Sequence, residues 1–338
     1  MSAFFNTDFL VCDGYYQDVM NTSVLPWLKE REITETVSGY QDRPLYTASW
    51  QADHPVGTVF IVHGFTENAF KYSELIFSLL HLHYSVVAYD QRGHGRSWRP
   101  DGIKDPSVTH VDSFSEYVED LQIICDHYSD VMPAPFLLFA HSMGGAVGVL
   151  FLEEHPGFFS GAVLSSPMIA PDLGGIPVPL ASVMAGLARF AGKGRDHPFF
   201  MKPYSGPEDF ASSCATDPSR FSWYDRIKEE RTEFRNSVPS WQWSCEAVHV
   251  TAKILAAGAP EKIDCPVLLF SAENDSTVLP EPQSVLVSRI RNGHRVLVRN
   301  AKHEIFRSRN DVLFPWWHDV LSFYSAVISG GTDVKEIG

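Results

Sequence analysis

The stretch FLLFAHSMGGAVGVLFLEEH, residues 136–155, places a serine between an apolar run and a helix-like run. The run before Ser142 is short and apolar, as in a buried strand, and the run after it is typical of a helix. A serine at such a junction lies on a tight strand-to-helix turn, and its hydroxyl projects above the sheet. Ser142 is therefore the predicted nucleophile.

This turn also needs small residues two positions before and after the serine, because their backbones nearly touch across it. Gly144 meets the second requirement, and Ala140 stands where the usual pattern has glycine. The alternative interpretation is an accidental run of small residues at the start of a helix. The apolar strand before the serine and the helix after it argue against that alternative.

Short apolar runs alternate with amphipathic stretches along most of the chain. The predicted strands cover residues 32–38, 45–51, 58–62, 85–89, 136–140, 161–165, 266–271 and 294–299. The predicted helices cover residues 70–82, 113–128, 144–154, 246–257, 282–291 and 311–328, with Asp112 and Asn310 as N-caps. Most later strands are apolar on both faces, which is typical of parallel strands between helix layers. The pattern predicts an α/β fold with a mainly parallel, eight-stranded sheet, opened by an antiparallel hairpin.

The alternation breaks once, between residues 167 and 264. This stretch opens with the linker-like PDLGGIPVPL at 171–180, continues with a helical pattern at 180–191 and is then rich in aromatic residues. A gap of this length exceeds ordinary connections, so an inserted subdomain is predicted. We expect a core formed by residues 1–170 and 246–338, and a mostly helical cap formed by residues 171–245.

Composition excludes several classes of function. The 338 residues carry a formal net charge of −14, and a surface of this sign repels phosphate backbones. No nucleic-acid partner is therefore expected, and basic docking to anionic lipid is disfavoured. The five cysteines, Cys12, Cys125, Cys214, Cys245 and Cys265, are widely spread and lack zinc-ligand spacing. Neither a disulfide framework nor a metal or other cofactor is expected.

The N-terminal stretch MSAFFNTDFLVCDG, residues 1–14, lacks a basic start, so no signal peptide is predicted. No apolar run approaches the roughly 18–20 residues that a membrane-spanning helix needs. We expect a cytoplasmic protein, with peripheral contact at the inner membrane face left open. The oligomeric state stays open as well.

Two further strands carry the partners that a serine nucleophile needs. In PVLLFSAENDSTV, residues 266–278, Asp275 follows an apolar strand, and in HRVLVRNAKHEIF, residues 294–306, His303 follows another. A base and an orienting acid in this chain order, each just beyond a strand, fit a serine hydrolase. The less well placed alternatives are the acids Glu273, Asp264 and Glu304 and the bases His294 and His318.

Backbone N–H groups must also stabilise the oxyanion of the reaction. The predicted donors are Met143, at the start of the helix after Ser142, and Phe65, in the loop that ends TVFIVHGFTE at residues 58–67. Gly64 is expected to let the chain turn there, and His63 is interpreted as a brace for the loop. The segment YDQRGHGRS, residues 89–97, lacks the spacing of a phosphate-binding loop and is interpreted as a structural turn.

Together, HGFTE, YDQRGHGRS, AHSMGG and the loops at Asp275 and His303 resemble serine hydrolases of the α/β-hydrolase fold. More narrowly, the chain is similar to the monoacylglycerol lipase and lysophospholipase L2-like group, over roughly residues 30–170 and 246–325. The resemblance implies Ser142 as nucleophile, His303 as base and Asp275 as its partner. It also implies oxyanion binding by the N–H groups of Phe65 and Met143, and no cofactor.

The resemblance implies hydrolysis of a single-chain lipid ester, a lysophospholipid or a monoacylglycerol, through an acyl-enzyme. A short-chain carboxylesterase, a peptidase or an acyltransferase could use the same three residues, and a non-catalytic ligand-binding protein is the alternative from another class. The cap aromatics could line an acyl pocket or form the cap's own core. The spacing of Leu180, Met184 and Leu187 favours packing against the protein over contact with a membrane or micelle.

Overall fold

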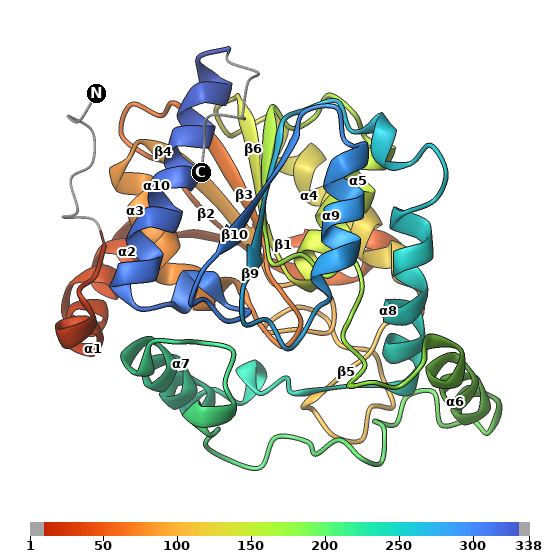
Figure 1. The fold of residues 1–338 in the computed structure, drawn as a ribbon. Coiled ribbons are helices and arrows are strands. Elements are labelled where there is room, and N and C mark those ends of the chain that lie inside the picture. Colours follow the sequence, from red (N-terminus) through yellow and green to blue (C-terminus); the bar gives the residue numbers. More distant parts are fainter. Residues whose placement is uncertain (1–9, 331–338) are drawn as a thin grey trace.

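A mixed sheet forms the centre of the computed structural model, which describes residues 10–330 (Figure 1). Its eight strands lie in the order β1-β2-β4-β3-β6-β7-β9-β10. The strands are β1 (Ile33–Ser38), β2 (Pro44–Trp50), β3 (Gly57–Val62), β4 (Tyr84–Tyr89), β6 (Phe136–His141), β7 (Gly161–Ser165), β9 (Val267–Ala272) and β10 (Gly293–Val298). β2 is antiparallel to β1 and β4, and the other neighbouring pairs are parallel. The predicted sheet and its edge hairpin are therefore confirmed.

The predicted absence of a signal peptide concerns residues 1–14, most of which lie outside the described residues, as do residues 331–338. Within residues 10–330, no helix combines the length and the apolar character that crossing a bilayer requires.

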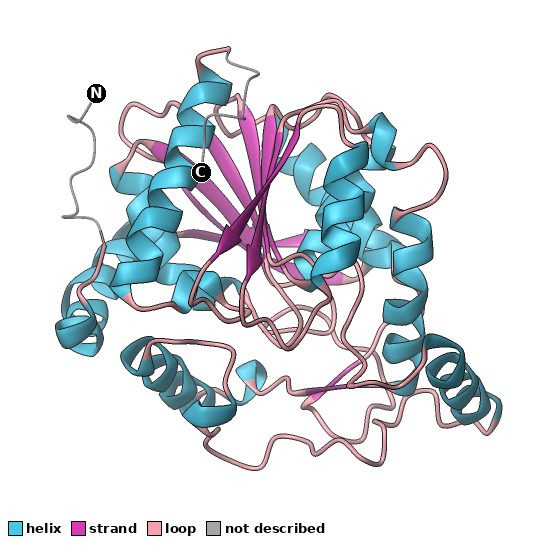
Figure 2. Ribbon diagram, viewed as in Figure 1, coloured by secondary structure: helices cyan, strands magenta, loops and turns pink. Residues whose placement is uncertain are grey.

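Helices cover both faces of the sheet (Figure 2). The longer helices are α2 (Leu25–Arg31), α3 (Ser73–His81), α4 (Ser115–Ser129), α5 (Met143–Glu154), α6 (Val178–Phe190), α7 (Pro218–Glu230), α8 (Trp241–Ile254), α9 (Pro280–Arg289) and α10 (Asn310–Ile328). One hydrophobic core joins the sheet to α4, α5, α8 and α9, and a second joins it to α2, α3 and α10. Alternate strand residues supply the two cores, as the two-residue period of a strand requires. In β3, for example, Phe60 faces the first core and Ile61 faces the second.

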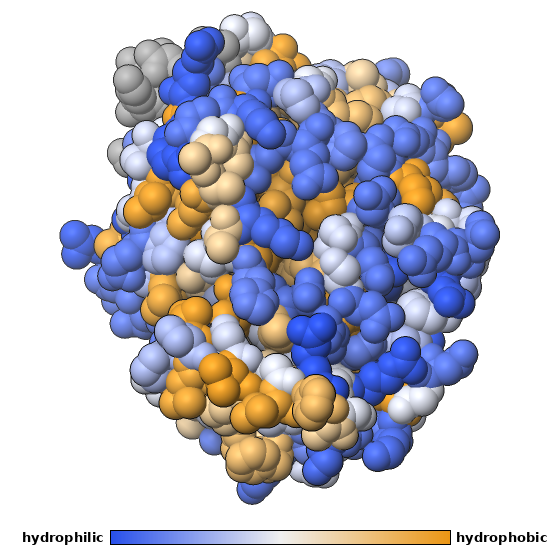
Figure 3. Space-filling model, turned by 90° about the vertical axis from the view of Figure 1, so that its right-hand side faces the viewer, coloured by the Kyte–Doolittle hydropathy of each residue, from blue (hydrophilic) through white to orange (hydrophobic). Residues whose placement is uncertain are grey.

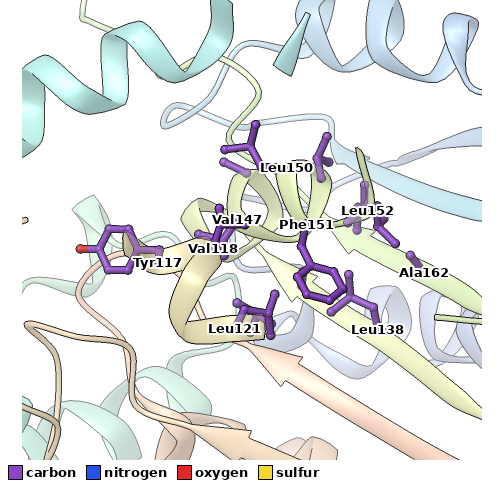
Figure 4. Close-up of a cluster of buried hydrophobic side chains, with 14 of the residues drawn as sticks. Tyr117, Val118, Leu121, Leu138, Val147, Leu150, Phe151, Leu152 and Ala162 are labelled. Atoms are coloured by element: carbon purple, nitrogen blue, oxygen red, sulfur yellow. The ribbon is translucent and has the colours of Figure 1, made fainter. Parts of the chain in front are cut away.

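The helix that follows Ser142, α5, is buried almost all round, from Met143 to Glu153. Figure 4 shows its side chains Val147, Leu150 and Phe151 among residues of α4 and of the sheet. Because a close-packed interior resists displacement, α5 holds the serine turn in a fixed position.

Both predicted N-caps are wrong, because distant side chains bind these helix starts. α4 begins at Ser115, and the N–H of its N-cap residue Phe114 donates to Glu246 Oε2 at 2.9 Å. α10 begins at Asn310 itself, and the Asn310 side chain accepts a hydrogen bond from Arg220 instead of capping the helix. The predicted helix 246–257 begins earlier, at Trp241, because the Ser240 hydroxyl caps it by accepting from the Trp243 N–H.

Residues 171–245 lie beyond the carboxyl ends of the parallel strands, and α6 and α7 stand apart from each other there (Figure 1). α7 is tied to the sheet-bearing part through Arg220, whose buried guanidinium donates to Glu74 at 2.8–2.9 Å and to Asp13 at 2.5 Å. In contrast, Ala185 is the one buried residue of α6. The two-residue strands β5 (Val108–Thr109) and β8 (Val238–Pro239) also pair here.

Candidate active site

Ser142 lies at the junction of β6 and α5, where the chain turns sharply. Its backbone has φ 52° and ψ −120°, a strained region for a residue with a side chain. Two hydrogen bonds hold the turn on the sheet: the Ser142 N–H donates to Ser165 O, and the Met168 N–H donates to Ser142 O. The hydroxyl is consequently presented at the carboxyl edge of the sheet, with 6% of the residue exposed.

Gly144 is needed for a different reason from the one expected. A Cβ at this position would lie 2.2 Å from Val62 O, so the close approach is to the end of β3, not to Ala140 across the turn. The Ala140 methyl group instead faces Gly148, where an added Cβ would lie 3.2 Å away. A second glycine therefore provides the room for alanine at position 140.

The structure brings the three predicted side chains into one chain of contacts. His303 Nε2 lies 2.8 Å from Ser142 Oγ, and His303 Nδ1 lies 2.8 Å from Asp275 Oδ2. Asp275 follows β9 and His303 follows β10, so the ends of parallel strands converge as predicted. We call these three residues the triad.

Asp275 is held in its ionised form. Burial raises the pKa of its carboxyl, but the hydrogen bond and charge of His303 and the N–H groups of Thr277 and Val278 outweigh burial, so the pKa lies below its usual value. An ionised Asp275 keeps the proton of His303 on Nδ1 and leaves Nε2 free to accept the Ser142 proton.

The alternative acids have other partners. Glu273 is exposed and accepts the N–H of Asn300 at 2.8 Å, while Asp264 accepts the N–H of Gly157. Glu304 is paired with Lys71 at 2.6 Å. The alternative base His294 lies at the opposite end of β10 from His303, and His318 lies in α10, 3.5 Å from Asp319. Within residues 10–330, Ser142 Oγ has its hydrogen bond with His303 and with none of these side chains.

The loop after β3 presses directly against the serine. A Cβ on Gly64 would lie 3.0 Å from Ser142 Cβ, so glycine is required by this close approach. The positive φ in the loop belongs to Thr66, at 64°, which corrects the expectation that Gly64 makes the turn. Among the described residues, neither Phe65 nor Met143 donates its backbone N–H to a protein acceptor. Both predicted oxyanion donors are thus available to a ligand.

His63 braces this loop, as expected, and is not a second base. Its Nε2 accepts the N–H of Gln91 at 2.9 Å, and the Gln91 side chain returns a hydrogen bond to His63 O. Burial lowers the pKa of His63, so the ring stays neutral. Within residues 10–330, no group of three or more His, Cys, Asp or Glu side chains is arranged to hold a metal ion.

Comparison with models of known protein families shows to which family the chain belongs. A family model described as serine aminopeptidase, S33 (Hydrolase_4), matches residues 53–310, well over half of the chain. The chain belongs to this S33 family. The matched range includes all three triad residues and the loop at Phe65.

Among curated relatives of this S33 member, lysophospholipase L2 of Escherichia coli (strain K12) is 28% identical over 314 residues, which cover 88% of each chain. The monoglyceride lipase of Homo sapiens is 35% identical over 144 residues, covering 38% of this chain and 44% of the relative. The solved structure of a monoacylglycerol lipase from Paleococcus ferrophilus superposes with a TM-score of 0.64 at 23% identity and covers 84% of this chain and 98% of its own. At that identity it supports the fold alone, and the predicted α/β-hydrolase fold is confirmed.

A buried charge network, which sequence analysis missed, lies beside the triad of this S33 member. Glu67 Oε2 accepts the N–H of Gly64 at 2.7 Å, and Glu67 Oε1 accepts from Lys71 Nζ at 2.8 Å. Lys71 also donates to Glu304 at 2.6 Å, and Arg307 donates to the other oxygen of Glu304. The network therefore joins the loop before Phe65 to the loop that carries His303. In the sequence, the four-residue spacing of Glu67 and Lys71 is the feature that could have indicated an ion pair.

Charge in this network is balanced by pairing. Burial raises the pKa of Glu67, but Lys71 outweighs it, and the pKa falls to about 2. His141 packs beside His303, with ring centroids 4.8 Å apart, and burial lowers its pKa to about 4. A neutral His141 therefore places no positive charge beside the His303 ring.

Proposed function

We propose that the chain hydrolyses carboxylic esters of single-chain lipids through an acyl-enzyme on Ser142. The observation that carries the proposal is the contact chain from Ser142 Oγ through His303 to Asp275, with both contacts at 2.8 Å. Membership of the S33 family supports serine hydrolase chemistry, and the relative named lysophospholipase L2, which matches over 88% of each chain, favours lipid esters.

In the proposed reaction, Ser142 Oγ attacks the ester carbonyl while its proton passes to His303 Nε2. The N–H groups of Phe65 and Met143 donate to the oxyanion that forms. His303 then protonates the departing alcohol. A water molecule, deprotonated by His303, attacks the acyl-enzyme and releases the fatty acid. Asp275 stays ionised throughout and stabilises the charged imidazole.

The two sides of the site differ in polarity, which suits a lipid with one chain and a polar end. On the side of α8, the Phe65 ring packs on Trp243 with centroids 4.2 Å apart. On the side of α7, Glu67, Lys71 and other charged residues border the site. An acyl chain gains free energy on the apolar side, because burial contributes about 0.8 kcal/mol per CH₂ group.

The first experiment measures product release from lysophosphatidylethanolamine, a monoacylglycerol, p-nitrophenyl butyrate and an aminoacyl p-nitroanilide. We expect fatty acid release from at least one long-chain lipid, with a kcat/KM above that for the short ester, because the longer chain buries more apolar surface. Cleavage of the short ester alone would identify a short-chain carboxylesterase. Cleavage of the anilide alone would favour aminopeptidase activity, which the description of the family names.

Transfer to an alcohol is tested in the same assay by adding glycerol. A new ester in place of free fatty acid would identify an acyltransferase. A protein that binds these lipids and releases no product would be the non-catalytic alternative, although the intact contact chain of the triad argues against it.

We further propose that residues 171–245 form an inserted cap, between core segments 1–170 and 246–338, and that α6 is its membrane-contacting helix in a cytoplasmic protein. The expected packing of Leu180 and Leu187 is wrong, because both side chains are exposed. The expected packing is confirmed for Met184: α6 packs on Trp241 and Cys245 of α8 through Ala185, with Met184 and Ala188 partly buried beside it. Its other face is apolar, and Figure 3 shows apolar residues gathered at the end of the molecule where α6 lies.

The double variant Leu187→Ser with Phe190→Ser is expected to bind phosphatidylcholine vesicles at least about tenfold more weakly than the wild type, since each side chain loses of order 1 kcal/mol of apolar burial. Leu187 is 65% exposed and Phe190 is 92% exposed. Sedimentation with vesicles measures the bound fraction. The matched control is Val285→Ser, because Val285 is 47% exposed on α9, away from α6. Equal loss in the control variant, or no loss in the double variant, would contradict the membrane contact.

A further inference from the structure

A polar chamber of about 740 Å³ lies on the side of α7, beside the loops that carry Phe65 and His303. We define it by its walls: the segment 202–214, α7 and the loops at Thr66 and Glu304. Thr66 follows Phe65, and Glu304 follows His303. Cys214, in another wall, lies 3.6 Å from Thr277, whose N–H donates to Asp275. The chamber therefore borders the loops of Phe65 and His303, and Cys214 connects its wall to the loop of Asp275.

The chamber is lined with charge of both signs in equal number. Its cations are Lys71, Lys202, Lys228 and Arg307, and its anions are Glu208, Asp209, Asp225 and Glu304. Such walls suit a ligand that is neutral overall and carries both charges. They do not suit an acyl chain, because apolar burial against charged groups returns little free energy.

Some of the charged groups that line the chamber are paired with one another, and others have no ion pair among the described residues. Lys71 and Arg307 bind Glu304, and Lys228 binds Glu208. Within residues 10–330, Lys202 and Asp209 have no ion pair, and both side chains are exposed. Asp225 accepts hydrogen bonds from the backbone N–H of Glu208.

Two hydroxyl groups of the chamber are also unsatisfied. Tyr204 Oη and Ser237 Oγ are buried atoms without a hydrogen-bond partner in the part of the chain that the structure describes. The Tyr204 ring lies close to two cations, Lys228 at 5.2 Å and Arg235 at 5.3 Å. A buried hydroxyl without a partner costs free energy, and a polar ligand that reached these hydroxyl groups would recover it.

From these observations we propose that the chamber binds the zwitterionic head group of a lysophospholipid. Lys202 and the hydroxyl of Tyr204 bind the phosphate, and the carboxylates of Asp209 and Asp225 bind the ammonium group. In a lysophospholipid, only the glycerol backbone separates the phosphate from the scissile ester. A chamber beside the loops of Phe65 and His303 is therefore close enough to the scissile ester to hold the head group. The inference rests on the proposed lipid ester hydrolysis and selects the lysophospholipid among its substrates.

The test compares lysophosphatidylethanolamine with a monoacylglycerol of the same short acyl chain, both below their critical micelle concentrations so that surface binding does not contribute. Lys202→Gln and Tyr204→Phe are each expected to raise KM for the lysophospholipid, roughly tenfold for the charge and severalfold for the hydroxyl. Hydrolysis of the monoacylglycerol stays within about twofold of the wild type. Lys193→Gln, an exposed cap lysine outside the chamber, is the matched control.

A second variant separates phosphate from ammonium recognition. Asp209→Asn is expected to lower the preference for lysophosphatidylethanolamine over the anionic lysophosphatidic acid, because a carboxylate that attracts ammonium and repels extra phosphate charge is lost. The side-chain oxygen of asparagine can still accept the Ala211 N–H that Asp209 binds at 3.1 Å. Equal KM changes for both head groups, or for lysophospholipid and monoacylglycerol alike, would overturn the inference.

Failure of the proposed function would look different. Soluble glycerophosphoethanolamine, which has no acyl ester, is expected to inhibit p-nitrophenyl butyrate hydrolysis competitively, and Lys202→Gln is expected to weaken that inhibition roughly tenfold. If the wild type cleaves neither lipid but shows this inhibition, the substrate proposal fails and the head-group site stands. If glycerophosphoethanolamine does not inhibit and the lipid KM values do not change among the variants, the head-group site is wrong.

Discussion

Ser142→Ala is expected to lower the rate of fatty acid release by at least about 10³-fold, the scale of loss when one member of a triad is removed. The variant keeps the N–H groups of Phe65 and Met143 and the surrounding walls, so a small residual rate remains. Alanine also fits the space, because among residues 10–330 the Ser142 hydroxyl has its hydrogen bond with His303 alone. The rate is measured as free fatty acid by chromatography, and thermal unfolding checks that the fold is intact.

Ser288→Ala is the matched control for this substitution. Ser288 is exposed on α9, and its hydroxyl donates to the nearby Val285 O. We expect the control to retain the wild-type rate. If Ser142→Ala retained it as well while remaining folded, another residue would have to be the nucleophile, and the role assigned to the triad would be wrong.

Asp275→Asn is expected to lower kcat by about 10⁴-fold, the effect of the same change in other serine hydrolase triads. Asp275 Oδ1 accepts the N–H groups of Thr277 and Val278 at 2.8 and 3.1 Å. In asparagine the carbonyl oxygen takes that position, so the NH₂ group faces His303 Nδ1. His303 must then accept at Nδ1 and carry its proton on Nε2. It can no longer take the Ser142 proton.

Glu273→Gln controls for the loss of a carboxylate in the same loop, since Glu273 was the competing acid closest to the strand. Its side chain accepts the N–H of Asn300, a bond that glutamine can also accept. We expect kcat within about twofold of the wild type. A large loss for Glu273→Gln together with none for Asp275→Asn would instead show that Glu273 is the acid that orients His303.

Much of the fold could be predicted because the signals are local. A strand that is buried on both faces must be apolar throughout, so β6 and β9 stand out as short apolar runs in the sequence. Helix ends were predicted less well because their partners are distant. The N–H of Phe114, the N-cap residue of α4, donates to Glu246, a residue of α8. No local pattern near residue 112 contains that information.

The triad could be predicted for a related reason. Each of its residues directly follows an apolar strand, and parallel strands bring those positions to one edge of the sheet. The buried charge network follows no such rule, because Lys71 and Glu304 are 233 residues apart and meet only in the folded chain. For α6, the helical period predicted an apolar face but not what covers it, so Leu187 was expected to be packed and is exposed.

The unequal attachment of α6 and α7 has a consequence for how this molecule can change during evolution. Arg220 of α7 is paired with Glu74 and Asp13, which belong to other parts of the chain. A substitution at Arg220 would leave both carboxylates without this partner, so residue 220 is expected to change only together with residues 74 and 13. α6 has no comparable constraint, because Ala185 is the one residue of this helix that is buried. Related sequences are therefore expected to vary faster in α6 than around Arg220 of α7.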